Sequence, residues 1–477
     1  MRLLTLFLTS LLFLTACVTP QQSSPAAPQA APSPVVETEA IPVPVKPTAA
    51  PATLENSLLA VEWKGGSEGN LLAPLDPNNG LALPDYAPIS VGRDYFYAFS
   101  PDRYTLAAVT FPNDNTHNGS LLLVDIPAWK TQKFDLKLRG WVNAMAFSPD
   151  GRQLAIAHGE SPHRLTIIDL ERGVITAQEK TDSFVMHLKF TADGKSLMLY
   201  SPVMQNFSTD EIGGDPPQVF LLNARDLSPR WSAQLEGVRD GIFPKDEKTA
   251  IDFNQPGTAM YLAPALTFAP DRDVLYIVHA DSGQLTTVDF GARTVETVEV
   301  QDRLSWFEQL LSLTADVAHA KVADGTSKQA AVSPDGQFLY VVGVKNDSFQ
   351  DQQGNWQMDQ TPLGLEIIHT RDGTRLMHIE TDASDLSLSP DGHFLYLRNW
   401  SEDDPWTEVF DTSTRQITAH KVGIYASPAL RVNGELLVVS TYSSNETFHR
   451  MGIFQPDGLD LLTEWTGPHY IAWLTPQ

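Results

Sequence analysis

The sequence predicts an all-β chain, a β-propeller of four-stranded antiparallel blades, on three observations. A short turn phrase recurs about every 55 residues, a period typical of propellers, solenoids and arrays. Alternating apolar residues precede each copy of the phrase, and a β-rich run follows it. A third β-rich run then ends in Asp or a similar residue, and a turn and a fourth run come after it. Four short antiparallel strands per repeat indicate a propeller blade.

The turn phrase is the most regular feature of the chain. Pro restricts φ, Asp hydrogen-bonds to its own backbone and Gly supplies a positive φ, so Ser-Pro-Asp-Gly predicts a hairpin turn between two strands. Its copies are Phe99–Asp102, Phe147–Gly151, Phe190–Gly194, Phe268–Asp271, Val332–Gly336, Leu388–Gly392 and a degenerate copy at Leu430–Gly434.

The runs after each turn predict the second and third strands of a blade. The second strands are expected at Leu154–Ala157, Leu275–Val278, Leu339–Val342 and Leu395–Leu397. The third strands are expected at Leu122–Asp125, Thr166–Asp169, Thr286–Asp289 and Thr407–Asp411.

The two ends of the chain decide the expected number of blades. Seven repeats are complete by about Trp465, and His469–Leu474 is then a strand with no chain after it. At the other end, Ser57–Trp63 and Asn70–Asp76 are strands with no innermost partner. Joining these strands would close the ring and remove the exposed sheet edges. We therefore expect eight blades, with seven as the alternative.

The repeated Phe-Ser-Pro-Asp-Gly turns resemble those of bacterial WD40-like and YVTN-type β-propellers. The resemblance covers nearly all of residues 54–477 and implies the propeller fold. The Trp-Asp dipeptide of true WD40 repeats is absent from the sequence, and Gly-His occurs only at Gly392-His393 among these turns. The resemblance implies no particular activity, because propellers carry many unrelated functions.

The beginning of the chain predicts export. Leu14-Thr-Ala-Cys17 follows the apolar run Leu3–Leu14, and Cys17 is the single cysteine of the sequence. The apolar run is shorter than the roughly 20 residues that span a bilayer, so we predict a cleaved signal peptide at 1–16. The four residues resemble a bacterial lipobox, which implies a lipidated Cys17 and a protein anchored to the cell membrane or envelope. An ordinary secretory signal is the alternative.

A tether and one domain follow the signal. Residues 17–53 are rich in Pro, Ala, Ser and Gln, which predicts a disordered, extended segment without a packed core. Residues 54–477 are predicted to form the β-propeller domain.

The charge of the chain excludes several partners. It carries 33 Lys and Arg against 58 Asp and Glu, a formal net charge of −25. This opposes binding to nucleic acid and a polybasic contact with anionic lipids. With Cys17 lipidated no thiol remains, so disulfides, thiolate metal sites and cysteine nucleophiles are excluded.

The long insertions predict a binding face. Strands of a blade alternate in direction, so connections after second strands and connections between blades share the face opposite the Ser-Pro-Asp turns. All six long insertions fall there: Phe111–Ser120, Ser201–Pro217, Glu236–Pro264, Gln301–Gln329, Gly343–Leu363 and Trp400–Trp406. Loops on a rigid frame commonly carry function. The alternative is that these loops merely cap the central channel.

Acidic and aromatic side chains of two insertions are the candidate binding residues: Asp347, Asp351, Trp356, Trp400, Asp403, Asp404 and Trp406. A metal at His158 and His163, or a hard cation at Asp347, Asp351 and Asp359, is a weaker hypothesis. No catalytic, metal or cofactor site is predicted, because the hydrolase, zinc, calcium-loop and phosphate-loop motifs are absent from the sequence.

Two hypotheses of function remain. The first is a lipid-anchored, non-catalytic binding or scaffold module for a protein, peptide or glycan of the envelope. The second is a propeller enzyme, similar to lactonases or quinoprotein dehydrogenases, with its site at the mouth of the channel. An enzyme should bring titratable groups or a metal together at that mouth, and few candidates do so.

Overall fold

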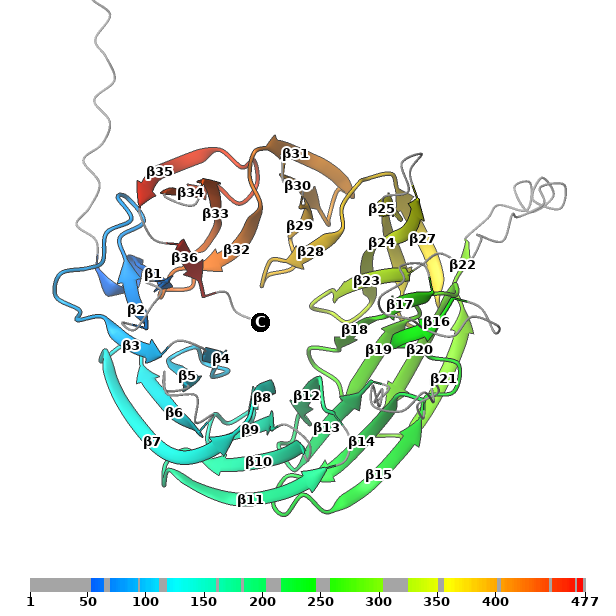
Figure 1. The fold of residues 1–477 in the computed structure, drawn as a ribbon, viewed down its shortest axis with the longest axis horizontal. Coiled ribbons are helices and arrows are strands. Elements are labelled where there is room, and N and C mark those ends of the chain that lie inside the picture. The colour runs from blue at the N-terminus through cyan, green and yellow to red at the C-terminus, as the bar shows by residue number, and fades with distance from the viewer. Residues whose placement is uncertain are drawn as a thin grey trace, which may run out of the picture. The chain divides into compact units, whose positions relative to one another are not determined.

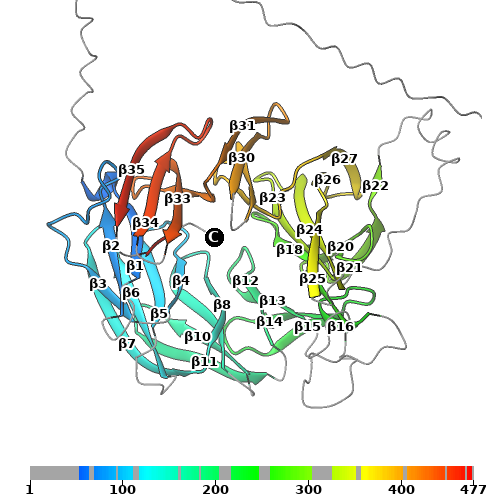
Figure 2. The same ribbon diagram turned by 45° about the horizontal axis from the view of Figure 1, so that its top comes forward.

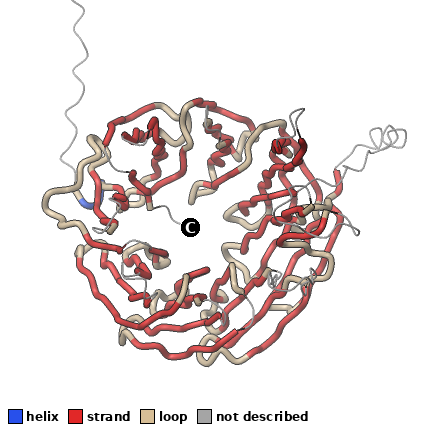
Figure 3. Tube along the Cα trace, in the orientation of Figure 1, coloured by secondary structure: helices blue, strands red, loops and turns tan. Residues whose placement is uncertain are grey.

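The computed structural model describes residues 53–63, 69–92, 95–110, 118–159, 163–181, 184–202, 216–245, 258–302, 325–350, 356–400, 405–445, 448–467 and 470–474. They lie in one compact unit, Ala50–Gln477. Figure 3 shows that regular structure there is β-strand apart from η1 (Leu54–Asn56), a single 3-10 turn. Among these residues no helix has the length and apolar character to cross a membrane. Cys17, the signal peptide and most of the tether lie outside the described residues.

Seven sheets are four-stranded antiparallel blades, which succeed one another around a common axis (Figure 1). Six of them use consecutive strands of the chain. These are β4 (Tyr95–Phe99), β5 (Thr105–Thr110), β6 (Asn118–Asp125) and β7 (Lys130–Arg139); β8 (Val142–Phe147), β9 (Gln153–His158), β10 (His163–Asp169) and β11 (Val174–Thr181); β12 (His187–Phe190), β13 (Ser196–Ser201), β14 (Gln218–Asn223) and β15 (Pro229–Gln234); β18 (Ala265–Phe268), β19 (Val274–Val278), β20 (Gln284–Asp289) and β21 (Thr294–Glu299); β28 (Asp385–Leu388), β29 (Phe394–Asn399), β30 (Trp406–Asp411) and β31 (Gln416–Val422); β32 (Ala426–Leu430), β33 (Leu436–Asn445), β34 (Phe448–Phe454) and β35 (Leu461–Gly467).

The seventh blade combines strands from both ends of the described chain. Its order is β3 (Ile89–Gly92), β2 (Asn70–Leu75), β1 (Leu58–Trp63) and β36 (Tyr470–Trp473). β1 pairs antiparallel with β36, with Ala60 opposite Trp473 and Trp63 opposite Tyr470.

The remaining sheet, here called the enlarged sheet, has eight strands. They are β16 (Gly241–Pro244), β17 (Ala259–Ala263), β22 (Gln301–Asp302), β23 (Gly325–Val332), β24 (Phe338–Gln350), β25 (Trp356–Pro362), β26 (Leu365–His369) and β27 (Thr374–Ile379). β23, β24, β26 and β27 pair antiparallel in that order, while β17 and β22 add parallel pairings to β23 and β27.

The prediction of eight four-stranded blades is therefore wrong. Seven sheets have four strands, and the strands of the eighth region belong to the enlarged sheet. The physical reason is that β24 extends past its neighbour β26, and that β23 has a second edge, so both strands have backbone groups that β26 and β24 leave unpaired. β17 and β25 supply partners for those groups. A turn motif repeated along the sequence carries no information about such additions.

The core lies between successive sheets and explains which strands are apolar. Every residue of β13 and of β19 is buried, whereas every residue of the outermost strand β21 is exposed. Side chains of neighbouring blades interleave: Val109 of β5 and Ile156 of β9 are fully buried in one cluster with Phe147. Burial of this kind provides the main stabilisation of the fold. Figure 2, a tilted view, shows the inner strands lining the axis.

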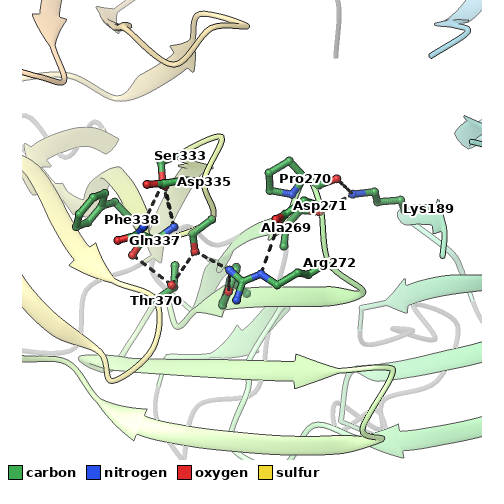
Figure 4. Close-up of polar contacts among 12 residues, drawn as sticks. Lys189, Ala269, Pro270, Asp271, Arg272, Ser333, Asp335, Gln337, Phe338 and Thr370 are labelled. Atoms are coloured by element: carbon green, nitrogen blue, oxygen red, sulfur yellow. Dashed lines mark hydrogen bonds and ion pairs between the residues drawn. The ribbon is translucent and has the colours of Figure 1, made fainter. Parts of the chain in front are cut away.

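The Ser-Pro-Asp turns all lie between the first and second strands of their sheets, at one end of the propeller that we call the turn face. In five of the seven turns, a hydroxyl donates to the turn aspartate and accepts from a backbone N–H. Ser333 Oγ donates to Asp335 at 2.5 Å and accepts from the N–H groups of Gln337 and Phe338 (Figure 4). The same bond links Ser100 with Asp102, Ser148 with Asp150, Thr191 with Asp193 and Ser389 with Asp391.

Candidate binding site on the loop face

The opposite end of the propeller, here called the loop face, contains a cavity of about 390 Å³. Its position follows from the strand directions, because residues 280–283 that line it connect β19 to β20, away from the turn at 270–273. Three of the predicted insertions supply lining residues. Arg239, Met260 and Leu262 come from the first, Thr326 and Lys328 from the second, and Lys345 and Leu363 from the third.

The parallel pairing of β17 with β23 brings two of these insertions together. Tyr261 lies opposite Gly325 in this pair, and Ala263 lies opposite Ser327. A Cβ atom at Gly325 would approach the Tyr261 carbonyl oxygen to 2.5 Å. Glycine is thus needed at this position for the two backbones to meet. The buried Met260 and Leu262 of β17 then form an apolar wall of the cavity.

Charged side chains form most of the polar lining. Arg239 Nη1 lies 3.2 Å from Asp281 Oδ2, and Arg375 Nη1 lies 2.5 Å from Glu366 Oε1. Both carboxylates of the lining are therefore engaged by an arginine. At the rim, Lys345 Nζ lies 3.4 Å from Asp347 Oδ2.

Lys328 is the remaining cation of the cavity. Among the described residues its Nζ has no hydrogen bond or ion pair. Burial lowers the pKa of Lys328, and the charges of Glu366 and Asp281 oppose this shift. Lys328 is half-buried and lines the cavity. An ammonium in this setting gains more from an added anion than one in bulk water.

Two buried histidines show a structural arrangement instead of a metal site. His158 Nε2 lies 2.9 Å from Thr166 Oγ1, and its Nδ1 lies 2.9 Å from the Arg139 carbonyl oxygen. In another blade, His279 Nε2 lies 2.7 Å from Thr286 Oγ1. Burial lowers the pKa of both imidazoles. Both ring nitrogens of His158 are thus engaged, one within its own blade and one by strand β7 of the preceding blade.

The cation hypotheses find no support among the described residues. His163 Nδ1 lies 3.0 Å from the Gly159 carbonyl oxygen. Asp347 lies opposite Asp359 across β24 and β25, and Asp351 is outside the described residues. In the part of the chain that the structure describes, no group of three His, Cys, Asp or Glu side chains could hold a metal ion.

The predicted binding residues are dispersed. Asp347 lies beside Lys345 at the rim of the cavity, and Trp356 begins β25. Trp406 is half-buried against the core and lies 5.5 Å from the ring of His420. Trp400 is exposed. Asp351, Asp403 and Asp404 lie outside the described residues, so their assignment stays a prediction.

Trp400 rests on a rigid support at the end of β29. Its side chain is 59% exposed, and its ring meets Tyr425 edge-on at 5.6 Å. Arg398 Nη2 donates to Asp385 at 2.8 Å, and its guanidinium lies 5.0 Å from the Tyr425 ring. Asp385 also accepts a hydrogen bond from the Tyr425 hydroxyl. The exposed indole is therefore held by a buried ion pair beneath it.

A second cavity, of about 780 Å³, lies between the innermost strands of four blades and extends to the turn face. Its walls are largely aromatic and aliphatic, including Tyr97, Phe147 and Phe268. Lys189, which also lines it, donates to the carbonyl oxygens of Ala269 and Pro270 (Figure 4). The cation of this cavity is thus held by backbone oxygens, in contrast to Lys328.

Sequence reasoning missed Arg239, Asp281, Lys328, Glu366 and Arg375. These residues come from five separate segments and form no local motif. One signal was available: Lys328 stands in a β-rich run immediately before a Ser-Pro-Asp-Gly turn, where the other repeats carry apolar or small residues at most positions.

Comparisons with known proteins show no family for this chain. No family model and no curated protein matches the chain. Solved structures similar to it include a eukaryotic initiation factor, with 11% identity, a TM-score of 0.46, and coverage of 87% of this chain and 98% of that chain. The β-propeller domain of Myceliophteria thermophila Cps50 (Swd1) has 11% identity, a TM-score of 0.40, and coverage of 77% and 98%. Kuenenia stuttgartiensis hydrazine synthase has 13% identity, a TM-score of 0.39, and coverage of 75% and 94%.

Proposed function

We propose that this chain is a non-catalytic binding module, exported and anchored to the envelope membrane through a lipid on Cys17. Its loop face binds a protein, peptide or glycan partner. The lipobox-like residues at 14–17 support the anchor. The convergence of three insertions on one charged cavity supports the binding face.

The chemistry of the cavity favours binding over catalysis. A general acid or base needs a free carboxyl or imidazole near the reacting atom. Asp281 and Glu366 are each engaged by an arginine instead. Such paired groups orient a ligand and line a site, and the cavity volume lies within the range of small-molecule pockets.

Site-specific photo-crosslinking of the full chain in its native envelope tests the binding face. A photoreactive amino acid replaces Ser282, which lines the cavity, or Ala192, which is exposed in a turn on the opposite face. We expect specific adducts from position 282 and none from position 192. Adducts at position 192 alone, or equal adducts at both positions, would contradict the assignment.

Metabolic labelling with an alkyne fatty acid tests the anchor. The wild-type chain should carry the label and sediment with membranes. Cys17→Ser should lose the label and appear in the soluble fraction. A labelled Cys17→Ser variant would show that the anchor lies elsewhere.

A further inference from the structure

We propose that the loop-face cavity binds the carboxylate group of an organic acid, with Lys328 as its counter-ion. The inference rests on the proposed binding function and names the chemistry that the same site recognises.

The charges of the cavity leave one cation uncompensated. Four cationic side chains and two carboxylates line it: Arg239, Lys328, Lys345, Arg375, Asp281 and Glu366. The two arginines pair with the two carboxylates, and Lys345 pairs with Asp347 at the rim. Lys328 remains. A single uncompensated positive charge matches a monoanionic carboxylate better than a dianionic phosphate, which would leave a negative charge among buried groups.

The position of this charge is unusual for the chain. The protein as a whole carries a formal net charge of −25, so non-specific attraction does not bring anions to its surface. The local excess of positive charge inside the cavity therefore belongs to this site and does not reflect the charge of the whole chain. The cavity also shields Lys328 from water, which strengthens its attraction for an anion that enters.

The walls of the cavity complete the description of the ligand. Met260, Leu262, Val278 and Ala280 are all buried and line it together with Val300 and Leu363. Thr326 and Ser282 add hydroxyl groups that can donate to a carboxylate oxygen. The site thus combines one anchoring charge with an apolar surface, as expected for an organic acid with a hydrophobic part.

Calorimetric titration with two probes of equal shape tests the proposal. Benzoate carries the carboxylate, and benzamide is its neutral counterpart. Benzoate should bind the full chain and protect Lys328 from acylation by acetic anhydride, measured by mass spectrometry. Lys195, whose side chain is 73% exposed at the turn face, should not be protected. Benzamide and inorganic phosphate should bind at least about tenfold more weakly.

Two pairs of variants separate the site from the fold. Lys328→Met removes the ammonium at nearly constant length and should weaken benzoate binding about tenfold or more, whereas Lys195→Met removes the same charge elsewhere and should not. Gly283→Phe fills the cavity, since a Cβ at Gly283 meets no atom within 4 Å. Gly458→Phe, at an exposed glycine on the turn face, is its control. Thermal unfolding of each variant verifies folding.

The outcomes distinguish this proposal from the proposed function. Equal binding of benzoate and benzamide, or unchanged binding by Lys328→Met, would overturn the carboxylate assignment, even if position 282 still forms adducts. Tighter binding of phosphate than of benzoate would overturn it as well. Where benzoate binds, its effect on the photo-crosslinked adduct at position 282 shows whether the carboxylate belongs to the partner or to a free acid. Suppression of the adduct assigns the group to the partner, and a persistent adduct assigns it to a free acid.

Discussion

At the turn face five aspartates are hydrogen-bonded within their own turns, whereas at the loop face charged groups pair between distant segments. Asp335 accepts from Ser333, two residues away, but Asp281 accepts from Arg239, which is 42 residues away. Local bonds of this kind recur in most sheets and hold hairpins together. A long-range pair such as Arg239 with Asp281 has no copy in the other repeats. The difference teaches that the repeated part of a propeller maintains the fold, while the unrepeated part is where specific recognition is to be sought.

The two cavities show the same contrast. The larger one lies among the innermost strands, and its lysine donates to backbone oxygens. The smaller one lies where insertions meet, and Lys328, one of its two lysines, has no such partner among the described residues. Volume alone would favour the larger cavity as the site, but an available charge favours the smaller one.

The largest expected effect concerns the ion pairs of the two faces. Arg398 and Asp385 are 9% and 19% exposed, and Arg398 also donates to Ser427. Arg398→Met should lower the free energy of unfolding by about 3 kcal/mol, because it leaves Asp385 buried without its cation. The exposed pair of Lys195 with Asp193 at the turn face should contribute little, so Lys195→Met should change stability by less than about 0.5 kcal/mol.

Urea denaturation of both variants measures the difference. Equal losses would show that burial does not distinguish the two faces. Because Arg398 supports Tyr425 beneath Trp400, the Arg398→Met variant should also shift the tryptophan emission, and Lys195→Met should not.

Glycine substitutions test how tightly the loop face of the enlarged sheet is packed. Gly364 and Gly423 both have positive φ, +74° and +80°. A Cβ at Gly364 would lie 2.7 Å from the Ile379 carbonyl oxygen, but one at Gly423 meets nothing within 4 Å. Gly423→Ala should therefore lower the free energy of unfolding by only about 1–2 kcal/mol, which is the cost of an alanine in the left-handed conformation. Gly364→Ala should lower it by at least about 1 kcal/mol more, because its Cβ also meets neighbouring atoms. Equal melting temperatures would show that the sheet relaxes around the added methyl.

The contrast between the faces also explains what the sequence could reveal. The four-stranded antiparallel blades were predictable because Pro, Asp and Gly act on adjacent residues, and because strand periodicity is local. The cavity could not be predicted from the sequence, since it depends on the parallel pairing of Tyr261 with Gly325 and on ion pairs such as Arg239 with Asp281. The same pairing makes the enlarged sheet depart from the expected four strands. Trp400 was predicted from its place in an acidic, aromatic insertion, but its support by Arg398 required the fold.

Removal of the turn hydroxyls should have a smaller and uniform effect. Each serine donates to its aspartate and accepts a backbone N–H, so Ser148→Ala, Ser333→Ala and Ser389→Ala should each lower stability by about 1 kcal/mol. Ser282 at the loop face makes one longer contact, 3.3 Å to Gln284 Oε1, and Ser282→Ala should be nearly neutral. Chemical denaturation of the four variants gives the comparison. Unequal losses among the three turns would indicate that the repeats are not energetically equivalent.

The smallest expected effect is a pH dependence of stability, which arises at low pH for the turn face and at higher pH for the loop face. Hydrogen bonds from Ser100, Ser148 and Ser333 lower the pKa of Asp102, Asp150 and Asp335. An acid with a lowered folded pKa stabilises the fold above its unfolded pKa of about 3.9, and this contribution disappears as the pH falls through the folded value. The loss should be shallow, because these carboxylates are largely exposed.

At the loop face, the charged form of Lys328 destabilises the fold, whereas the charged aspartates of the turn face stabilise it. Burial lowers its pKa, with Glu366 and Asp281 opposing the shift and Arg375 adding to it. A base with a lowered folded pKa destabilises the fold while it is charged. Stability should therefore rise between its folded pKa and the unfolded value of about 10.4. Urea midpoints at acid, neutral and alkaline pH measure both effects. Ser333→Ala should flatten only the acid limb, and Lys328→Met only the alkaline limb. If either variant flattened both limbs, the charges of the two faces would be coupled through the blades, which the short range of the turn bonds argues against.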